Sequence, residues 1–434
     1  MADRNIEGDS KVSEQARNGA NYIKQFFENA PDKTFTVERI ISQGSWGFTL
    51  QMMMRSAGGS DETSETSSST TLSQAPGLQP LPPLHGNTPL GSFNRTDQSK
   101  KRARTSRFVM KRSLAEVGEK NITTEIDALD APAPVIRPLK GPTLLMEWIE
   151  NGLLWDFYEK RSELDEPLPN RLLWSLFLCL CRIVVGLAWP PRDLGKQVRG
   201  KPALEVIPPL NERGERPPKS RLLHGDFHGQ NIMIDKLEPL EHKSVPLLKL
   251  IDFGMSRDLP VRANELQDIV VKTNIRAIGE VMLGLLRGNV SGGPGMMDIT
   301  YNGQPRRINS YATDLDKLST KYKAPAVMVA KHQDRIDNLD PEIRSLVAAC
   351  VAVRVEDRPN IENLLSIVER NARNKRADDY RGYKYSNNET DAAIKRIVEE
   401  TMFNVQSHNI PKLGLPPPQS QGLSALPFGP TGYI

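Results

Sequence analysis

The feature that most constrains the fold of this chain is a long apolar run, LLWSLFLCLCRIVVGLAW, at residues 172–189. The run is about long enough to cross a membrane, but Arg182 lies near its middle, and a charged side chain is costly at the centre of a bilayer. Hydrophobic residues make up 38% of the chain and charged residues 25%, so a core that encloses the run can form. We therefore predict a buried helix and no membrane partner.

Charge and cysteine content narrow the class of protein. The formal net charge of +4 is small for 434 residues, which argues against a protein organised around nucleic-acid phosphates. The cysteines, Cys179, Cys181 and Cys350, are too few for a disulfide framework, and a reducing compartment is expected. The stretch MADRNIEGDSKVSEQARN at the start contains no apolar core of a secretory signal. We therefore expect a cytoplasmic or nuclear protein.

Secondary-structure patterns change along the chain from mainly strands to mainly helices. Strand-like runs with glycine-containing turns come early, and helical periodicity dominates later. The expected strands lie at 35–54 (a hairpin), 107–113 and 142–152 (a strand and then a turn). The expected helices lie at 14–30, 122–131, 172–189 and 389–405, and helical patterns dominate from 275 to about 372. This order predicts an α+β fold with a small β-rich lobe and a larger helical lobe.

Two polar insertions interrupt these patterns. Residues 56–106 are rich in Ser, Thr, Gly, Pro and Gln and cannot bury enough surface to order themselves, and residues 190–220 are rich in Pro, Arg and Lys. Because strand-like sequence resumes after the first insertion, we place one domain at 35–370, with a helical extension at 1–34 and a charged helix with a Pro-rich tail at 371–434. The first insertion and the tail are candidate segments for binding partners.

The stretch HGDFHGQN, residues 224–231, combines side chains that bind metals with side chains that move protons. His224 and His228 are four residues apart, which on a helix would place both imidazoles on one face, as a zinc site can require. Gly225 and Gly229 disfavour such a helix, and the Glu of a zinc protease motif is missing after His224. We therefore interpret the stretch as a polar loop.

Phosphoryl transfer is a chemistry that such a loop can serve. It needs a carboxylate beside the attacking hydroxyl, a cation on the nucleotide phosphates, and oxygen ligands for magnesium that face the same point. Asp226 can supply the first of these, and Asn231 with Asp252, which lies in LKLIDFG at 248–254, can supply the third. The stretch is therefore a candidate catalytic loop.

The chain resembles the eukaryotic-type protein kinase family over most of residues 35–370. Two motifs carry the resemblance, the catalytic-loop pattern H-R-D followed by four residues and Asn, and the metal-binding pattern D-F-G. The residues that match them are His224, Asp226, Asn231, Asp252, Phe253 and Gly254. The resemblance implies a bilobal protein-kinase-like fold in which Asp226 is the catalytic aspartate, while Asn231 and Asp252 hold magnesium.

Motifs earlier in the chain resemble the ATP-binding part of the same family. ISQGSWGFT at 41–49 resembles the glycine-rich loop over the phosphates, FVMK makes Lys111 the phosphate-pairing lysine, and EIDAL makes Glu125 its partner. LLMEWIENGLL resembles the hinge between the lobes, at 146–152. The residues that the resemblance assigns to ATP are Ile41, Ser42, Gly44, Ser45, Gly47, Thr49, Lys111, Met146, Glu147 and Trp148.

Three departures from the family pattern concern regulation and the acceptor. Gly225 stands where an Arg usually holds a phosphorylated activation loop, so activation through that loop is not expected. The activation segment, residues 255–273, is short, and Asn274 stands where an Asp is usual. His228 replaces a lysine that commonly helps to neutralise the transferring phosphate, which a histidine does only in part near neutral pH.

The identity of the acceptor stays open. In VEDRPN, Arg358 resembles a late arginine of the family that pairs with an acidic residue of the activation segment, for which Glu265 is the candidate. This motif and the hinge favour an ATP-dependent Ser/Thr protein kinase that uses magnesium and a protein substrate. The HGDxH pattern also resembles kinases of small molecules such as aminoglycosides or choline. A further alternative is an ATP-binding pseudokinase scaffold.

Overall fold

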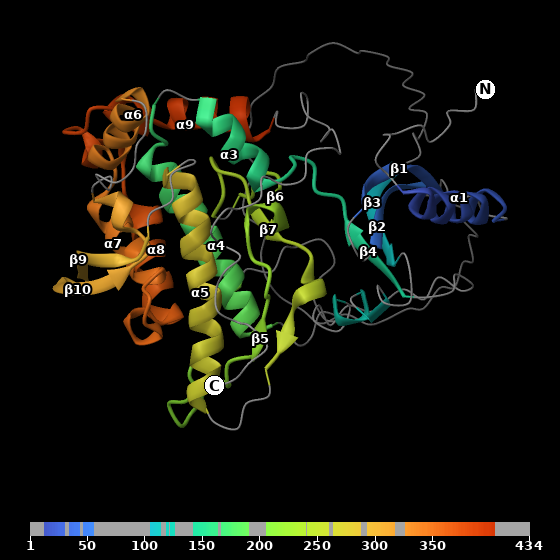
Figure 1. Ribbon diagram of the computed structural model, residues 1–434, viewed down its shortest axis with the longest axis horizontal. Helices are drawn as coiled ribbons and strands as arrows, with labels where there is room; N and C mark the ends of the chain where they lie inside the picture. The colour runs from blue at the N-terminus through green and yellow to red at the C-terminus, as the bar shows by residue number, and fades with distance from the viewer. Residues whose placement is uncertain are drawn as a thin grey trace, which may run out of the picture.

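The computed structural model shows a mixed α+β chain with a small antiparallel sheet (Figure 1). It describes residues 13–30, 34–43, 47–55, 105–113, 119–120, 122–125, 142–163, 166–190, 205–239, 241–259, 264–287, 293–316 and 326–403. Nearly all of the first predicted insertion, much of the second and the tail from residue 404 lie outside this set, as do Gly44 and Ser45.

Four antiparallel strands form the sheet, in the order β1-β2-β3-β4. Their bounds are Phe35–Gln43, Gly47–Arg55, Thr105–Ser113 and Thr143–Glu147. The hairpin predicted at 35–54 and the strand predicted at 107–113 are confirmed, and Thr49 of β2 lies opposite Lys111 of β3. Because successive side chains of a strand point to opposite faces, Met110 and Lys111 face opposite sides of the sheet.

Helix α1, Glu14–Glu28, covers one face of the sheet (Figure 1). Ser13 caps it by accepting a hydrogen bond from the N–H of Ala16 at 3.2 Å. The apolar residues of α1 recur at helical spacing and are buried in one cluster with Met110 and residues of β1 and β2; they are Ala16, Ala20, Ile23 and Phe27. The sheet and α1 therefore share a core of their own.

The larger region consists mainly of helices around α4, Asn170–Ala188. The other helices are α3 Leu154–Glu163, α5 Asn264–Arg287, α6 Ala326–Asp337, α7 Pro341–Cys350, α8 Ile361–Asn374 and α9 Asp391–Ile397. Among the described residues, α4 alone is long and apolar enough to cross a membrane, but 78% of its apolar window is buried inside the protein. Arg182 at its middle pairs with Glu241 at 2.7 Å. The predicted buried helix is confirmed.

Short strands between the helices carry the polar loops. β6, Ile232–Ile234, pairs antiparallel with β7, Leu248–Leu250. β5, Leu222–Leu223, pairs antiparallel with β8, Arg257–Asp258. The loop that holds HGDFHGQN runs from β5 to β6, and the loop that holds IDFG runs from β7 to β8. The two pairings therefore bring these loops side by side.

The prediction of helical structure was wrong for residues 295–310. They form a hairpin of β9, Gly295–Tyr301, and β10, Gln304–Ser310. Asn302 and Gly303 at its turn have φ angles of 52° and 72°. An Asn-Gly pair with positive φ at both residues is typical of a two-residue hairpin turn, so the signal for this hairpin was present in the sequence.

Two further boundaries differ from the prediction. Helix α5 begins at Asn264 and not near residue 275, so the segment between Gly254 and this helix comprises only residues 255–263. The stretch after residue 370 is part of the helical core up to Phe403, because Ile394 and Ile397 are buried in it. A strand or helix that packs on a core belongs to that domain, so the boundary that we predicted at residue 370 is too early.

Candidate active site

Two neighbouring loops carry the polar residues that the sequence singled out. The N–H of Ile251 donates to the carbonyl of Asn231 at 2.9 Å, and this bond extends the pairing of β6 with β7. As a result, Asn231 before β6 and Asp252 after β7 stand at the same end of the strand pair. The structure thereby places the two predicted magnesium ligands on adjacent loops, although they are far apart in the sequence.

His224 holds these two loops together. It is fully buried, its Nε2 donates to the carbonyl of Ile251 at 3.2 Å, and its Nδ1 accepts from the N–H of Asp226 at 3.3 Å. Its ring packs edge-on against Phe253, with 4.8 Å between the ring centroids. Burial lowers the pKa of His224, which favours the neutral imidazole that these two bonds require. Both ring nitrogens are in use, so His224 is a structural residue and not a metal ligand.

Asp226 is held from both sides by its own loop. His228 Nε2 lies 3.0 Å from Asp226 Oδ1, and Asn231 Nδ2 donates to Asp226 Oδ2 at 2.8 Å. The His228 ring accepts at Nδ1 from the N–H of Gln230, so in the neutral ring Nε2 carries the proton. The hydrogen bond from His228, helped by that from Asn231, lowers the pKa of Asp226. Asp226 is therefore an oriented, ionised carboxylate, and 43% of its side chain is exposed.

Lys111 lies between two carboxylates. Its Nζ is 2.7 Å from Glu125 Oε2 and 2.8 Å from Asp252 Oδ1. Burial lowers the pKa of Lys111, but attraction to Glu125 and Asp252 outweighs burial and the pKa is raised. Burial raises the pKa of Glu125 and the lysine opposes this. The predicted pair of Lys111 with Glu125 is present, and Asp252 joins it from the other region of the molecule.

The backbone of Asp252 adopts a rare conformation. Its φ and ψ angles are 63° and 73°, in the left-handed region that a residue with a side chain seldom occupies. Such a conformation costs about 1 to 3 kcal/mol and persists only where its surroundings impose it. Here the carboxylate is held by Lys111 and by the N–H of Gly254, which donates to Oδ1 at 3.4 Å.

Gly225 is required by the shape of the loop. Its φ angle is +81°, and a Cβ added to it would lie 2.5 Å from the carbonyl oxygen of Met255. The loop after Asp252 therefore passes directly over the position where the family pattern has an Arg. The absence of that Arg is explained by backbone packing, because no side chain of any kind fits there.

Strands β1 and β2 carry part of the predicted ATP site. Ile41 and Ser42 belong to β1, Gly47 and Thr49 belong to β2, and Ser42 lies opposite Thr49. A Cβ on Gly47 would overlap the carbonyl oxygen of Arg112 in β3. Close approach of β2 to β3 is thus sufficient reason for this glycine.

The predicted hinge lies where the sheet meets the helical region. Met146 of β4 lies opposite Val109 of β3, and Trp148 follows the end of the strand at Glu147. The Glu147 carboxylate pairs with Lys249 Nζ at 2.6 Å. Lys249 also pairs with Asp235 at 2.8 Å. Sequence reasoning missed Lys249 and Asp235, because nothing in their local sequence marks them as partners of the hinge.

Arg358 does not make the predicted pair with a carboxylate in the contacts that the structure describes. It is buried, and its guanidinium donates to the carbonyl oxygens of Ala352 at 3.0 Å, Lys272 at 3.4 Å and Val353 at 3.4 Å. The side chain of Glu265, in the first turn of α5, lies outside the described residues. Arg358 thus ties α5 to the turn after α7 through backbone oxygens.

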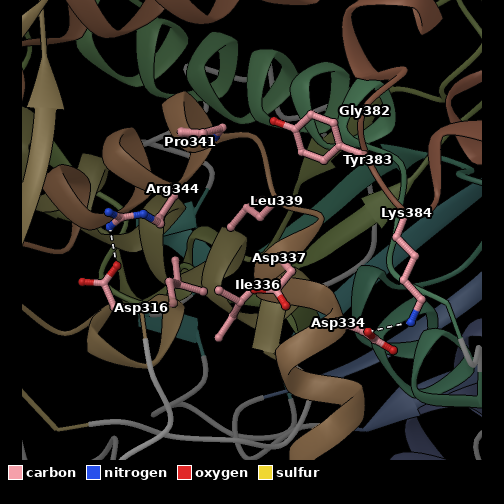
Figure 2. Close-up of a pocket in the computed structure, with 11 residues that line it drawn as sticks. Asp316, Asp334, Ile336, Asp337, Leu339, Pro341, Arg344, Gly382, Tyr383 and Lys384 are labelled. Atoms are coloured by element: carbon pink, nitrogen blue, oxygen red, sulfur yellow. Dashed lines mark hydrogen bonds and ion pairs between the residues drawn. The ribbon is translucent and has the colours of Figure 1, made fainter.

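A hollow of ≈ 610 Å³ lies elsewhere, between α6, the start of α7 and the segment around Tyr383 (Figure 2). Its charged side chains form pairs within its wall, Asp316 with Arg344 at 2.6 Å and Asp334 with Lys384 at 2.8 Å. None of the predicted site residues lines it. The pairs neutralise most of its charge, so the hollow offers no catalytic set.

Comparison with known proteins assigns no role to these residues. No protein-family model matches the chain, and a search of the curated proteins gave no match. Within the part of the chain that the structure describes, no group of three or more His, Cys, Asp or Glu side chains could hold a metal ion. The geometry around Lys111, Asp226 and Asp252 is therefore the basis for assigning a function.

Proposed function

We propose that this protein is an ATP-dependent phosphotransferase with a bilobal protein-kinase-like fold, and that it moves the γ-phosphoryl group onto a Ser or Thr hydroxyl of a protein. The observation that carries the proposal is the position of Lys111, which contacts Glu125 on its own side and Asp252 on the other. A cation held in this way can bind nucleotide phosphates beside a carboxylate that can bind a metal.

The residues present fit magnesium and ATP. Asn231 uses its amide nitrogen for both of its bonds to Asp226, which leaves the amide oxygen as an acceptor for a cation. The Asp252 carboxylate is 46% exposed and can supply a second oxygen. Magnesium commonly takes one or two protein oxygens and completes its shell with phosphates and water. When bound, it offsets the negative charge of the phosphates.

The proton of the acceptor hydroxyl would go to Asp226. This carboxylate is ionised, because hydrogen bonds from His228 and Asn231 lower its pKa, and it is partly exposed. The same two bonds fix its orientation, so it can accept a hydrogen bond from a hydroxyl without rearranging. Lys111 would orient the phosphates, with Glu125 holding the lysine in place.

A small hydroxyl compound is the second candidate acceptor, and one observation favours it. Only residues 255–263 separate Gly254 from α5, and Arg257–Asp258 of that segment pair with β5. Few residues are left to form a surface on which a peptide could dock. The resemblance of the hinge and of VEDRPN to protein kinases favours the protein acceptor.

Transfer of radiolabelled phosphate from ATP tests the proposal. The acceptors would be a generic basic protein and a panel of aminoalcohols and sugars, and the variants would be Asp226→Asn and, as a matched control, Asp298→Asn, whose exposed carboxylate lies on β9. We expect Asp226→Asn to lower the rate by a factor of about 100 or more, as for loss of a general base, and Asp298→Asn to leave it unchanged.

The same experiment contains the results that would contradict the proposal. Equal incorporation by wild type and Asp226→Asn would remove Asp226 from its role. A wild-type protein that binds ATP and magnesium but transfers nothing to any acceptor would instead be a nucleotide-binding scaffold. Transfer to small compounds but not to protein would replace the first acceptor with the second.

A further inference from the structure

Helix α3 is fixed to the strand that follows the candidate catalytic loop. The N–H of Asn151 donates to the carbonyl of Ile234 at 3.2 Å, and the N–H of Ile234 donates to the carbonyl of Gly152 at 2.9 Å. These bonds join the residues just before α3 to β6, which directly follows Asn231. The start of α3 therefore lies beside the end of the loop.

Tyr158 of α3 packs on this loop at Gly229. A Cβ added to Gly229 would lie 2.9 Å from Tyr158 Cε2 and 3.5 Å from the backbone nitrogen of Trp155. Carbon atoms that are not bonded to each other attract best at about 3.5 to 4.0 Å. A side chain at position 229 would therefore push the ring away, and the glycine is what allows the loop to approach α3 this closely.

The same ring is held on another side by α5. The Tyr158 hydroxyl donates to the carbonyl of Val281 at 3.0 Å. Burial raises the pKa of Tyr158, so the hydroxyl keeps the proton that this bond needs. A Cβ added to Gly284 would lie 3.1 Å from the same ring carbon, Cε2. The ring thus fills the space between Gly229 of the loop and Gly284 of α5, and the bond to Val281 limits its rotation.

Gly229 lies in the part of the loop that orients Asp226. His228 precedes it and Asn231 follows it, and these two side chains hold the two oxygens of the Asp226 carboxylate, at 3.0 Å and 2.8 Å. The N–H of Asn231 also donates to the carbonyl of His228 at 2.9 Å, so residues 228–231 form one compact turn. A shift of this turn would move both partners of Asp226 at once.

We propose that Tyr158 is a positioning residue, whose ring supports the turn at 228–231 so that His228 and Asn231 keep the Asp226 carboxylate oriented. This role rests on the proposed function, because it takes Asp226 as the group that receives the proton of the acceptor. A misplaced general base slows transfer while the contacts that bind the substrates remain. Loss of the ring therefore lowers kcat and leaves both KM values nearly unchanged.

Three variants separate this role from a general contribution to stability. Tyr158→Leu removes the ring, Tyr158→Phe removes only the hydroxyl bond to Val281, and Gly284→Ala presses on the ring from α5. Phe157→Leu is the matched control, because Phe157 is the neighbouring aromatic residue of α3 and is fully buried in the helical core. The value of kcat, the KM values for ATP and acceptor, and the melting temperature would be measured for the full chain.

We expect Tyr158→Leu to lower kcat about tenfold, with both KM values within about twofold of the wild type. Phe157→Leu should lower the melting temperature at least as much and keep kcat within about twofold. Tyr158→Phe retains the ring, so most of kcat should be retained with it. A merely structural role of Tyr158 would make the two leucine variants alike, with reduced stability and an unchanged kcat.

Gly284→Ala tests whether the effect passes through the ring. It should lower kcat about threefold in the wild-type background, because the added Cβ displaces the ring toward the loop. In the Tyr158→Leu background no ring is present, so Gly284→Ala should add nothing to the loss of kcat. The same loss in both backgrounds would contradict a path through Tyr158.

Amide hydrogen exchange of residues 226–231 gives a readout that does not depend on activity. Exchange there should be faster in Tyr158→Leu than in Phe157→Leu. Equal exchange together with equal kcat in these two variants would overturn the role of Tyr158 and leave the proposed function standing. A wild type with neither an ATP-dependent thermal shift nor phosphate transfer would overturn the proposed function itself, while the exchange rates would still show whether Tyr158 holds the loop.

Discussion

The sheet region and the helical region differ in how each is held together. Buried side chains of the helical region form one large cluster around α4, whereas the sheet has a small separate cluster to which α1 contributes a whole face. Ion pairs join the two regions, Lys111 with Asp252 and Lys249 with Glu147. A small core joined through charges is easier to open than a large apolar one, so we expect the sheet to open first.

The largest expected effect comes from core truncation in each region. Leu50→Ala in β2 and Leu180→Ala in α4 remove fully buried side chains, and each should cost about 3 kcal/mol of stability. Because the clusters are separate, Leu50→Ala should speed amide hydrogen exchange in the sheet and α1 but not in α4. Exchange measured by mass spectrometry would check this. Faster exchange in α4 as well would mean that the regions open as one unit.

Gly225→Ala is expected to have the next largest effect. The left-handed φ angle and the carbonyl of Met255 together should make the substitution cost more than about 2 kcal/mol and abolish phosphate transfer. Gly214→Ala is the matched control, since Gly214 has a φ angle of +75° with open space around it, and it should cost about 1 kcal/mol. Urea unfolding measures both. Equal losses would show that the contact with Met255 is unimportant.

A smaller effect should come from the ion pair at the hinge. A double-mutant cycle of Lys249→Met with Glu147→Gln should give a coupling energy of about 0.5 kcal/mol, because Glu147 is largely exposed, and high salt should abolish it. The same cycle with Asp235→Asn should give about 1 kcal/mol, because Asp235 is mostly buried. Urea unfolding at two salt concentrations checks both values. A stronger pair with Glu147 would contradict the view that the regions are loosely joined.

The smallest effect is a dependence of stability on pH. Burial lowers the pKa of His224 in the folded protein, so below about pH 6.5 the unfolded chain binds a proton that the folded chain does not. The contribution of His224 to the free energy of unfolding should therefore be constant above about pH 6.5. It should fall as the pH drops from about 6.5 toward the lowered pKa of His224 in the folded protein. His224→Gln should reduce this slope in urea unfolding.

His242 offers a matched control for the pH experiment, because burial also lowers its pKa and it lies in the helical region away from the site. His242→Gln should reduce the slope of stability against pH to a similar extent while phosphate transfer continues. His224→Gln should impair transfer as well, since His224 joins the two loops. Unimpaired transfer in His224→Gln would show that the loops hold their positions without it.

Local sequence was enough to predict most of the elements and the polar loops, but not every strand or boundary. The apolar run at 172–189 forms a buried helix because nearly all of its side chains are apolar, and apolar side chains are favoured in the interior. The hairpin at 295–310 was not predicted although Asn302 and Gly303 mark its turn, because it lies between helices whose periodicity dominates this part of the sequence. The start of α5 at Asn264 was also missed.

The sequence by itself determined which chemical groups are present and how they are spaced, namely Lys111, Asp226, Asn231 and Asp252. Their types and spacing suggested phosphoryl transfer. Tertiary structure decided which of them meet. The pairing of β6 with β7 sets Asn231 beside Asp252, and Lys111 reaches Asp252 from the sheet. The absence of an Arg at Gly225 and the packing of α1 on the sheet were likewise invisible, because each depends on contacts between segments that are not neighbours in the chain. Contacts of that kind leave no local pattern in sequence.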